Sequence, residues 1–492
     1  MKKYLLELVV FISGAVVMIV ELVGSRILAP YLGTSIVVWT SLIGIILGSL
    51  SVGYWWGGKM ADKGANYKQF SKILFISSLL IAYIAALKFS ILSVAASQSG
   101  NLYLNAVIAT IALFAPGSVV LGMVSPYAIR LKMKDVATSG ATVGALYAIS
   151  TVGSIVGTFA AGFILIAFFG STNILLVLAG VQLLLSVIAY RVAWKRAGAV
   201  MLFLIASAFF AQWFSVAFAK FGLVEIDTPY NHLQIYDGVD RANGRPIRIL
   251  KIGHEQSSAI YLDGDDLVFD YTKFYRMAAH FNPNINTALM IGGGAYTYSK
   301  DFLTQFPRST MDVVEIDPAL KQIATKYFKF FETPRLNIIH EDGRTFLNKN
   351  TKKYDVIYGD AFKSYSPPFQ LSTKEAVEKM YDSLTDNGVA IINIISSVDG
   401  EAGKFLRAEY ATFSYVFPQV YLFPVTDSND GELVQNIMLV ALKSNKEISW
   451  SSNDLETRIY LSHRWERNLP SDMEVLTDEY APVENYMIQA AI

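Results

Sequence analysis

Three acidic residues and a run of glycines have the spacing of a nucleotide-binding site. The apolar run ALMI leads into Gly292, Gly293 and Gly294, a helix-like segment follows, and a second apolar run ends in Glu315. In a βαβ unit of this kind the glycines let the backbone approach the ligand, and a carboxylate about 20 residues later binds the ribose hydroxyls. We therefore expect a nucleotide to bind at this loop.

Two further acids follow the next apolar runs. Asp342 ends the third run, in HEDGR, and Asp360 ends the fourth, in YGDAFKSYSPP. A single acid at a strand end is more often a helix cap or a turn residue. Three acids at three successive strand ends, next to a glycine loop, instead favour a ligand site. The loop reads GGGAY rather than GxGxxG, and Asp342 could accept from an adenine amine. These features favour an S-adenosyl ligand over a dinucleotide.

The elements around these residues predict an α/β domain. From residue 286 strand and helix patterns alternate, which is typical of a doubly wound parallel sheet with ligands at the carboxyl ends of its strands. The β-rich runs QVYLFPV and VQNIMLVAL near the end predict an antiparallel pair, as in the methyltransferase variant of this sheet. We predict an S-adenosyl-binding, methyltransferase-like (Rossmann-type) domain over 285–492. Alternating residues with Gly and Asn-Gly breaks predict a small β-hairpin module over 221–284.

The first 220 residues have the composition of a membrane protein. The chain has 492 residues, of which 53% are hydrophobic, and its mean hydropathy is +0.38. These values are too apolar for a typical soluble protein, and the length is too great for one domain. Apolar segments near 20 residues long predict a multi-span α-helical membrane domain of about seven spans. They lie near 5–28, 36–57, 73–95, 104–128, 143–168, 172–192 and 199–219.

Charge and rare residues exclude several classes of site. The 41 basic and 41 acidic residues balance, so charge does not indicate a nucleic-acid partner. Cysteine is absent, which excludes disulfides, a thiolate nucleophile and cysteine metal ligands. Five histidines without a close pair argue against a zinc site, so we expect no metal.

The loop charges predict an inner-membrane protein with several crossings. Lys and Arg cluster in alternate loops, which should face the cytoplasm. Seven spans would then place the C-terminal half outside the cytoplasm, whereas the supply of nucleotide cosubstrates favours the inside. Glu21 and Arg26 fall near the end of the first span, where they either fix the bundle or line a substrate path.

A set of short motifs resembles the spermidine synthase (polyamine aminopropyltransferase) family, and more closely its membrane-fused bacterial branch. The motifs are TPYNHLQIY, IYLDG, IGGGA, VVEIDP, HEDGR, YDVI with GDA, LTDEYAPVEN and, in the apolar half, ELVGSRILAPYLG and VWTSLIG. The resemblance implies a β-hairpin lid before a methyltransferase-like sheet. It also implies transfer of an aminopropyl group from decarboxylated S-adenosylmethionine to an amine, with release of methylthioadenosine and no prosthetic group.

The resemblance assigns roles to individual residues. It makes 292–294 the ligand loop, Glu315 the ribose ligand, and Asp342 with Gly343 the adenine contact. Asp360 becomes the base that takes a proton from the attacking amine. Asn231 occupies the position where the family usually has a Gln near the ligand.

Two departures from the family concern the charge of the donor. Where the family has an Asp that binds the aminopropyl ammonium, this chain has Ala295, and where a second acid follows the catalytic one it has Lys363. A lysine near an ammonium costs about 1 kcal/mol at ~4 Å in water and more in a dry site. A lysine suits a carboxylate, so we predict that Lys363 helps to bind intact S-adenosylmethionine. The family's tyrosine–histidine pair falls at Phe274 and Tyr275, so the acceptor side also differs.

Four hypotheses for the function remain open. The first is a transferase with a small-molecule amine acceptor, and the second is a lyase that expels methylthioadenosine without an acceptor. The third is a methyltransferase, and the fourth is a membrane transporter or sensor whose C-terminal half only binds ligand. The expected partners are the lipid bilayer, an amine and a second copy of the chain in a homo-oligomer.

Overall fold

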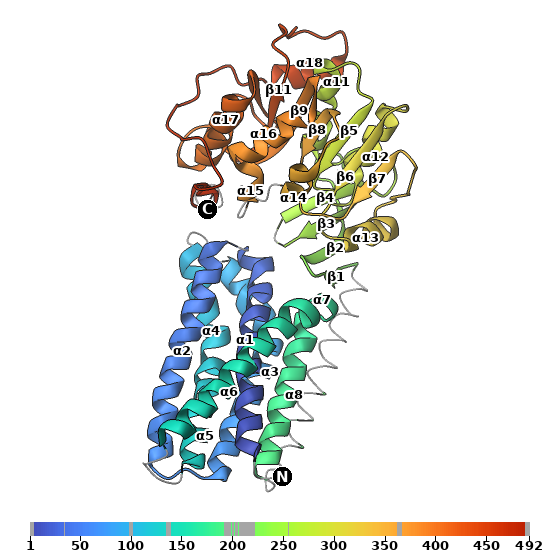
Figure 1. Ribbon diagram of the computed structural model, residues 1–492. Helices are drawn as coiled ribbons and strands as arrows, with labels where there is room; N and C mark the ends of the chain where they lie inside the picture. The colour runs from blue at the N-terminus through green and yellow to red at the C-terminus, as the bar shows by residue number, and fades with distance from the viewer. Residues whose placement is uncertain are drawn as a thin grey trace. The chain divides into compact units, whose positions relative to one another are not determined.

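The chain folds into two compact units, Met1–Leu233 and Gln234–Ile492, here called the helical unit and the α/β unit. The computed structural model describes residues 4–33, 35–97, 102–133, 139–190, 198, 201, 205, 222–253, 255–361 and 367–487. Figure 1 shows the long helices of the first unit and the sheet of the second. Each unit is described separately below.

The described part of the helical unit contains six helices long and apolar enough to cross a membrane. They span Leu5–Leu32, Ile36–Asp62, Tyr67–Ala95, Tyr103–Lys132, Ser139–Leu165 and Ser171–Ala189. Each overlaps one of the first six predicted spans. The predicted seventh span, 199–219, lies almost entirely outside the described residues.

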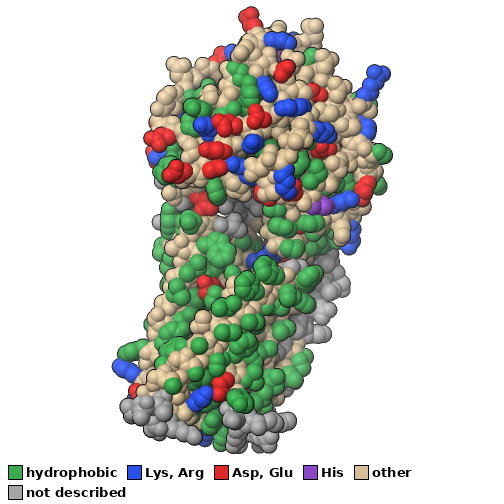
Figure 2. All heavy atoms as spheres, viewed as in Figure 1, with side chains coloured by type: hydrophobic (Ala, Val, Ile, Leu, Met, Phe, Trp, Pro, Cys, Tyr) green, Lys and Arg blue, Asp and Glu red, His purple; other side chains and the backbone are tan. Residues whose placement is uncertain are grey.

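The described helical elements of this unit include these six helices and the short helix α7, which follows the fifth of them. These are α1 (Leu5–Leu32), α2 (Ile36–Asp62), α3 (Tyr67–Ser97), α4 (Leu102–Gly122), α5 (Val124–Lys132), α6 (Ser139–Ala160), the π-helix Ala161–Leu165, α7 (Ile166–Phe168) and α8 (Ser171–Ala189). Figure 2 shows hydrophobic side chains over most of the visible surface of these helices, while Lys, Arg, Asp and Glu gather on the α/β unit. An outward apolar surface of this kind is what a lipid environment requires.

Glycines allow helices α1 and α6 to pack closely. A Cβ on Gly153 would lie 2.0 Å from the carbonyl oxygen of Phe11, and one on Gly157 would lie 2.5 Å from that of Ala15. Small residues at such crossings are common where apolar helices associate in lipid. Arg26, within α1, donates to the carbonyl of Thr228, which links this helix to the turn after β1.

A four-stranded sheet follows the helices. Its order is β1 (Val224–Asp227), β2 (His232–Val239), β3 (Pro246–Ile252) and β4 (Glu255–Tyr261). Strands β3 and β4 pair antiparallel, with a register shift after Leu250. This sheet corresponds to the predicted β-hairpin module. A helical connection follows, formed by α10 (Asp270–Phe274), a 3-10 turn (Tyr275–Met277) and α11 (Ala278–Phe281).

The α/β unit is built on a seven-stranded sheet with the order β10-β11-β9-β8-β5-β6-β7. Its strands are β5 (Thr287–Ile291), β6 (Thr310–Val314), β7 (Leu336–Ile339), β8 (Tyr354–Gly359), β9 (Leu384–Ser396), β10 (Gln419–Pro424) and β11 (Gln435–Leu442). The five strands β5 to β9 run parallel, and β11 lies antiparallel between β9 and β10. The predicted methyltransferase-like doubly wound sheet with a final antiparallel pair is therefore confirmed.

Helices connect the strands and cover the sheet. They are α12 (Thr297–Gln305), α13 (Ala319–Tyr327), α14 (Gly343–Lys349), α15 (Phe369–Ser372), α16 (Lys374–Asp382), a 3-10 turn (Glu401–Gly403), α17 (Lys404–Val416), α18 (Leu455–Ser462) and α19 (Val483–Met487). The central strands are buried on both faces, so they read as continuous apolar runs such as AIINII. The strand order reverses between β5 and β8, and ligands of such sheets bind beyond the carboxyl ends at that point.

Candidate active site

The glycine loop follows β5 and turns sharply. Gly292 has φ = 94° and Gly294 has φ = 51°, which are left-handed conformations that favour glycine. A Cβ on Gly292 would lie 2.5 Å from the carbonyl oxygen of Asp360. The backbones after β5 and β8 therefore meet closely, and the amide of Asp360 donates to the carbonyl of Ile291 at 2.8 Å. This contact places the loop beside one predicted catalytic residue.

Glu315 lies directly against the glycine loop. Its Oε2 accepts from the amides of Gly293 at 2.8 Å and Gly294 at 3.2 Å, and its Oε1 accepts from the amide of Asp317 at 2.9 Å. Burial raises the pKa of Glu315, while these three backbone amides lower it. The carboxylate is held rigidly at the end of β6, and Oε1 keeps a free lone-pair direction for a hydroxyl.

Asp342 and Gly343 begin helix α14 at the end of β7. Asp342 is the N-cap, and its Oδ1 accepts from the amide of Thr345 at 2.9 Å. A Cβ on Gly343 would lie 2.8 Å from Cγ2 of Ile291. The start of α14 thus packs on the strand that leads into the glycine loop. Asp342 has the capping role that is usual for an acid at this position, and its second oxygen is not used by the cap.

Side chains from distant parts of the chain form hydrogen bonds to Asp360. Its Oδ1 accepts from Nδ2 of Asn393 at 3.0 Å, and its Oδ2 accepts from the hydroxyl of Tyr271 at 3.3 Å. Burial raises the pKa of Asp360, while hydrogen bonds from Asn393, Tyr271 and Tyr275 lower it. Nδ2 of Asn436 donates to Oδ1 of Asn393 at 2.9 Å, which orients the Asn393 amide with its donor toward Asp360.

Several tyrosine rings pack together next to this carboxylate. The hydroxyl of Tyr275 donates to the carbonyl of Gly359 at 3.2 Å, and its ring meets those of Tyr271 and Tyr358 edge to face. Burial is the main cause that raises the pKa of Tyr275 well above its usual range, so this phenol stays protonated and serves as a donor. The resemblance had placed Tyr275 at the family's histidine position. Here its ring packs against Tyr271, which hydrogen-bonds to Asp360.

Sequence reasoning missed Tyr271 and Asn393. Tyr271 lies in the segment DYTKFYRM, but nothing in its spacing connects it to a strand end 89 positions later. Asn393 had a signal, because it is the polar residue inside the otherwise apolar strand run AIINII. A buried amide in a central strand needs a hydrogen-bonding partner, and Asp360 provides one.

Strand β4 covers the glycine loop from the other side. The hydroxyl oxygen of Ser258 accepts from the amide of Ala295 at 3.0 Å, and the carbonyl of Ser257 accepts from the hydroxyl of Tyr271 at 3.5 Å. A Cβ on Gly294 would lie 2.7 Å from Oγ of Ser258. The hairpin module therefore contacts both the loop and the tyrosine that holds Asp360.

The roles predicted for Asn231 and Lys363 stay predictions. Asn231 belongs to the helical unit, where its amide donates to Oγ1 of Thr228 at 2.9 Å and its carbonyl accepts from the amide of Thr228 at 2.9 Å. Lys363 lies outside the described residues. Among the described residues, no group of three or more His, Asp or Glu side chains could hold a metal ion.

The chain is similar to known proteins. Residues 272–426 match the family model described as the spermine/spermidine synthase domain. A polyamine aminopropyltransferase of Vibrio vulnificus is 27% identical over 247 residues, which cover 47% of this chain and 81% of that protein. A probable polyamine aminopropyl transferase of Bifidobacterium longum is 30% identical over 220 residues, and this chain covers 49% of its length.

Two solved structures also align with part of the chain. A probable spermidine synthase from Corynebacterium glutamicum aligns with a TM-score of 0.40 and 24% identity, covering 48% of this chain and 86% of that one. A spermidine synthase in complex with the transition state analogue AdoDATO aligns with a TM-score of 0.38 and 18% identity, covering 49% and 84%.

Proposed function

Residues 272–426 match the spermine/spermidine synthase domain, and on that premise we propose that the chain transfers the propyl-side group of an S-adenosyl sulfonium donor to an amine. The amine nitrogen attacks the carbon next to the sulfonium, the carbon–sulfur bond breaks, and methylthioadenosine leaves. The proton lost by the amine passes to Asp360. Because the sulfonium is already a good leaving group, catalysis consists mainly of alignment and proton removal.

One observation carries this proposal: the carboxylate of Asp360 is held beside the glycine loop by Asn393 and Tyr271. Both are neutral donors, so they orient the carboxylate without neutralising it with a cation. The backbone contact between Gly292 and Asp360 brings the expected nucleoside loop and the expected base together at the switch point of the sheet. We therefore assign Glu315 to the ribose, Asp342 and Gly343 to the adenine and Asp360 to the amine.

We further propose that the donor is S-adenosylmethionine itself rather than its decarboxylated form. Ala295 supports this proposal, because its methyl group is buried and its amide is bonded to Ser258, so no acid stands there for a donor ammonium. Lys363 would bind the donor carboxylate. A Lys363→Asp variant should weaken binding of S-adenosylmethionine and improve binding of the decarboxylated donor. Calorimetry with both donors measures this preference, and an unchanged preference would exclude the role of Lys363.

Product analysis tests the reaction. Purified protein is incubated with each S-adenosyl donor, with and without a diamine, and the products are identified by mass spectrometry. We expect methylthioadenosine together with an enlarged amine. Methylthioadenosine without an amine product would indicate a lyase, and adenosylhomocysteine would indicate a methyltransferase. Absence of turnover with intact donor binding would favour a transporter or sensor.

We also propose that the helical unit anchors the enzyme in the inner membrane. The six long apolar helices and their apolar outer surface support this proposal. Since the chain has no cysteine, one cysteine introduced at the exposed Glu432 reports the side of the α/β unit without background. Labelling by a membrane-impermeant maleimide in spheroplasts indicates an external unit, and labelling only after lysis indicates a cytoplasmic one.

A further inference from the structure

Two residues other than glycine have positive φ in the described part of the chain: Tyr296 with φ = 58° and Lys329 with φ = 54°. Such conformations are strained and persist only where surrounding contacts hold them, often at functional sites. The two residues are linked, because the ring of Phe330 packs on that of Tyr296 with centroids 4.9 Å apart. Tyr296 ends the glycine turn, and its ring lies over Gly293. The strain is therefore concentrated around the expected donor site.

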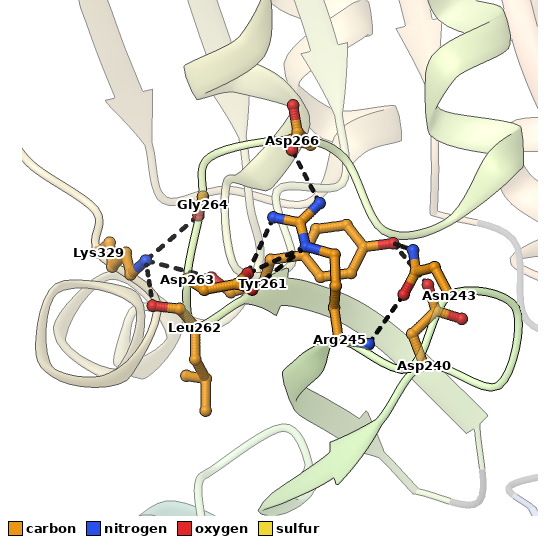
Figure 3. Close-up of polar contacts among 9 residues, drawn as sticks. All are labelled: Asp240, Asn243, Arg245, Tyr261, Leu262, Asp263, Gly264, Asp266 and Lys329. Atoms are coloured by element: carbon orange, nitrogen blue, oxygen red, sulfur yellow. Dashed lines mark hydrogen bonds and ion pairs between the residues drawn. The ribbon is translucent and has the colours of Figure 1, made fainter.

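The ammonium group of Lys329 binds the end of strand β4. Its Nζ donates to the carbonyls of Tyr261 at 3.1 Å, Leu262 at 3.1 Å and Gly264 at 3.2 Å (Figure 3). An ammonium has three N–H donors, so all of them can be used here. Lys329 follows helix α13, far from β4 in the sequence. It thus joins the lid strand to the domain that carries the glycine loop.

The same segment is held from its other side by a second network. The guanidinium of Arg245 lies over the ring of Tyr261 at 3.7 Å and pairs with Asp263 at 2.8 Å and Asp266 at 3.0 Å (Figure 3). The hydroxyl of Tyr261 donates to Oδ2 of Asp240 at 2.5 Å. These contacts hold residues 261–266 in place. Because Lys329 binds carbonyls of this segment, which continues from β4, it also fixes the position of β4.

The position of β4 in turn determines the position of two contacts at the site. Ser258, three residues before Tyr261, accepts from the amide of Ala295, and Ser257 accepts from Tyr271. We propose that Lys329 is a positioning residue for the adenosyl donor: it holds β4 so that Ser258 fixes the end of the glycine turn. The inference rests on the proposed function, because it assigns the turn to the nucleoside of an S-adenosyl donor.

The test uses full-length protein in detergent and methylthioadenosine, the nucleoside shared by both donors, as the binding probe. Lys329→Met keeps the length of the side chain and removes its charge, while Lys329→Gly also relieves the positive φ. Lys300→Met is the matched control, because Lys300 reaches Asp265 in the same segment through an exposed ion pair, and such pairs contribute little.

We expect both Lys329 variants to raise the Kd for methylthioadenosine and the donor KM about tenfold, with kcat at saturating donor within about twofold. The control variant should match the wild type. A merely structural role would predict that Lys329→Gly, which relieves strain, binds as the wild type does. Equal binding by wild type and both Lys329 variants would overturn the inference while leaving the proposed function intact.

A second measurement separates failure of the inference from failure of the function. In ligand-free protein, hydrogen exchange at the amide of Ala295 should be faster in Lys329→Met than in the wild type and unchanged in Lys300→Met. Unchanged exchange in Lys329→Met would overturn the inference even if the wild type bound no S-adenosyl compound. Binding of none of these compounds by the wild type would instead overturn the proposed function.

Discussion

The two ends of the candidate site are built in different ways. At the donor end, Glu315 is held by the amides of Gly293, Gly294 and Asp317, which all lie within 22 positions of it in the chain. At the reacting end, Asp360 is held by the side chains of Tyr271 and Asn393, which lie 89 and 33 positions away. The donor end depends on a local motif, whereas the reacting end depends on long-range packing. Substitutions at the two ends should therefore affect different kinetic constants.

The largest effect is expected at the reacting end. Asp360→Asn keeps the shape of the side chain but removes its ability to take a proton. Turnover should fall by about 10²–10⁴-fold, as for loss of a general base, while binding of methylthioadenosine changes little. Steady-state kinetics and calorimetry together measure this split. Normal turnover would show that Asp360 is not the base, and a parallel loss of binding would show that the two ends are not separate.

Sequence patterns located the loop and acids of the donor end because their contacts are local, while their role in donor binding stays a prediction. The glycines, Glu315, Asp342 and Gly343 stand at the strand ends where the pattern placed them, and the order of strands follows from alternating βα units. Asp342 also shows a limit, since its capping bond to Thr345 is a contact that any helix-starting acid can make. Its role toward adenine therefore remains a prediction.

The reacting end could not be predicted because its members meet only in the folded chain. Tyr271 comes from the connection before β5, Asn393 from β9 and Asn436 from β11, and no spacing rule joins them. The anchoring of β4 by Lys329 was hidden for the same reason, because its partners are backbone carbonyls that carry no sequence signal. In the helical unit, hydropathy located the six described spans but did not reveal the glycine contacts between α1 and α6.

A smaller effect, on binding rather than turnover, is expected at the donor end. Glu315→Gln keeps a carbonyl acceptor for the loop amides but loses the charge that strengthens a hydrogen bond to a ribose hydroxyl. A hydrogen bond to a charged group contributes about 1.5–3 kcal/mol, so the donor KM should rise about tenfold to a hundredfold. The value of kcat at saturating donor should stay within a few-fold of the wild type, which is the reverse of the Asp360→Asn pattern.

The control for this variant is Asp312→Asn. Asp312 lies on β6, three positions before Glu315, and pairs with Lys352 and Tyr354 rather than with the glycine loop. Asp312→Asn should lower the thermal stability of the protein and leave the ratio of kcat to the donor KM unchanged. If Asp312→Asn and Glu315→Gln gave the same kinetic pattern, the special role of Glu315 would be excluded.

The smallest expected effect distinguishes the roles of Tyr271 and Asn393, the two residues that hydrogen-bond to Asp360. Burial raises the pKa of Asp360, and the hydrogen bond from Tyr271 opposes this rise because it stabilises the ionised form. A base acts only when ionised, so kcat should rise with pH through this pKa and level off above it. Tyr271→Phe removes one stabilising bond and should move the acidic limb of the pH–rate profile to higher pH.

A hydrogen bond to a charged group contributes about 1.5–3 kcal/mol, and this one is long, at 3.3 Å. Tyr271→Phe should therefore cost about tenfold in kcat on the acidic limb and almost nothing on the plateau. The Phe ring retains the edge-to-face contact with Tyr275, so the packing is the same in the variant and in the wild type. A shift to lower pH would mean that Tyr271 stabilises the protonated acid instead and would contradict this assignment. A loss that is equal at every pH would mean that Tyr271 does not tune the pKa of Asp360 and would leave Asn393 as the residue that does.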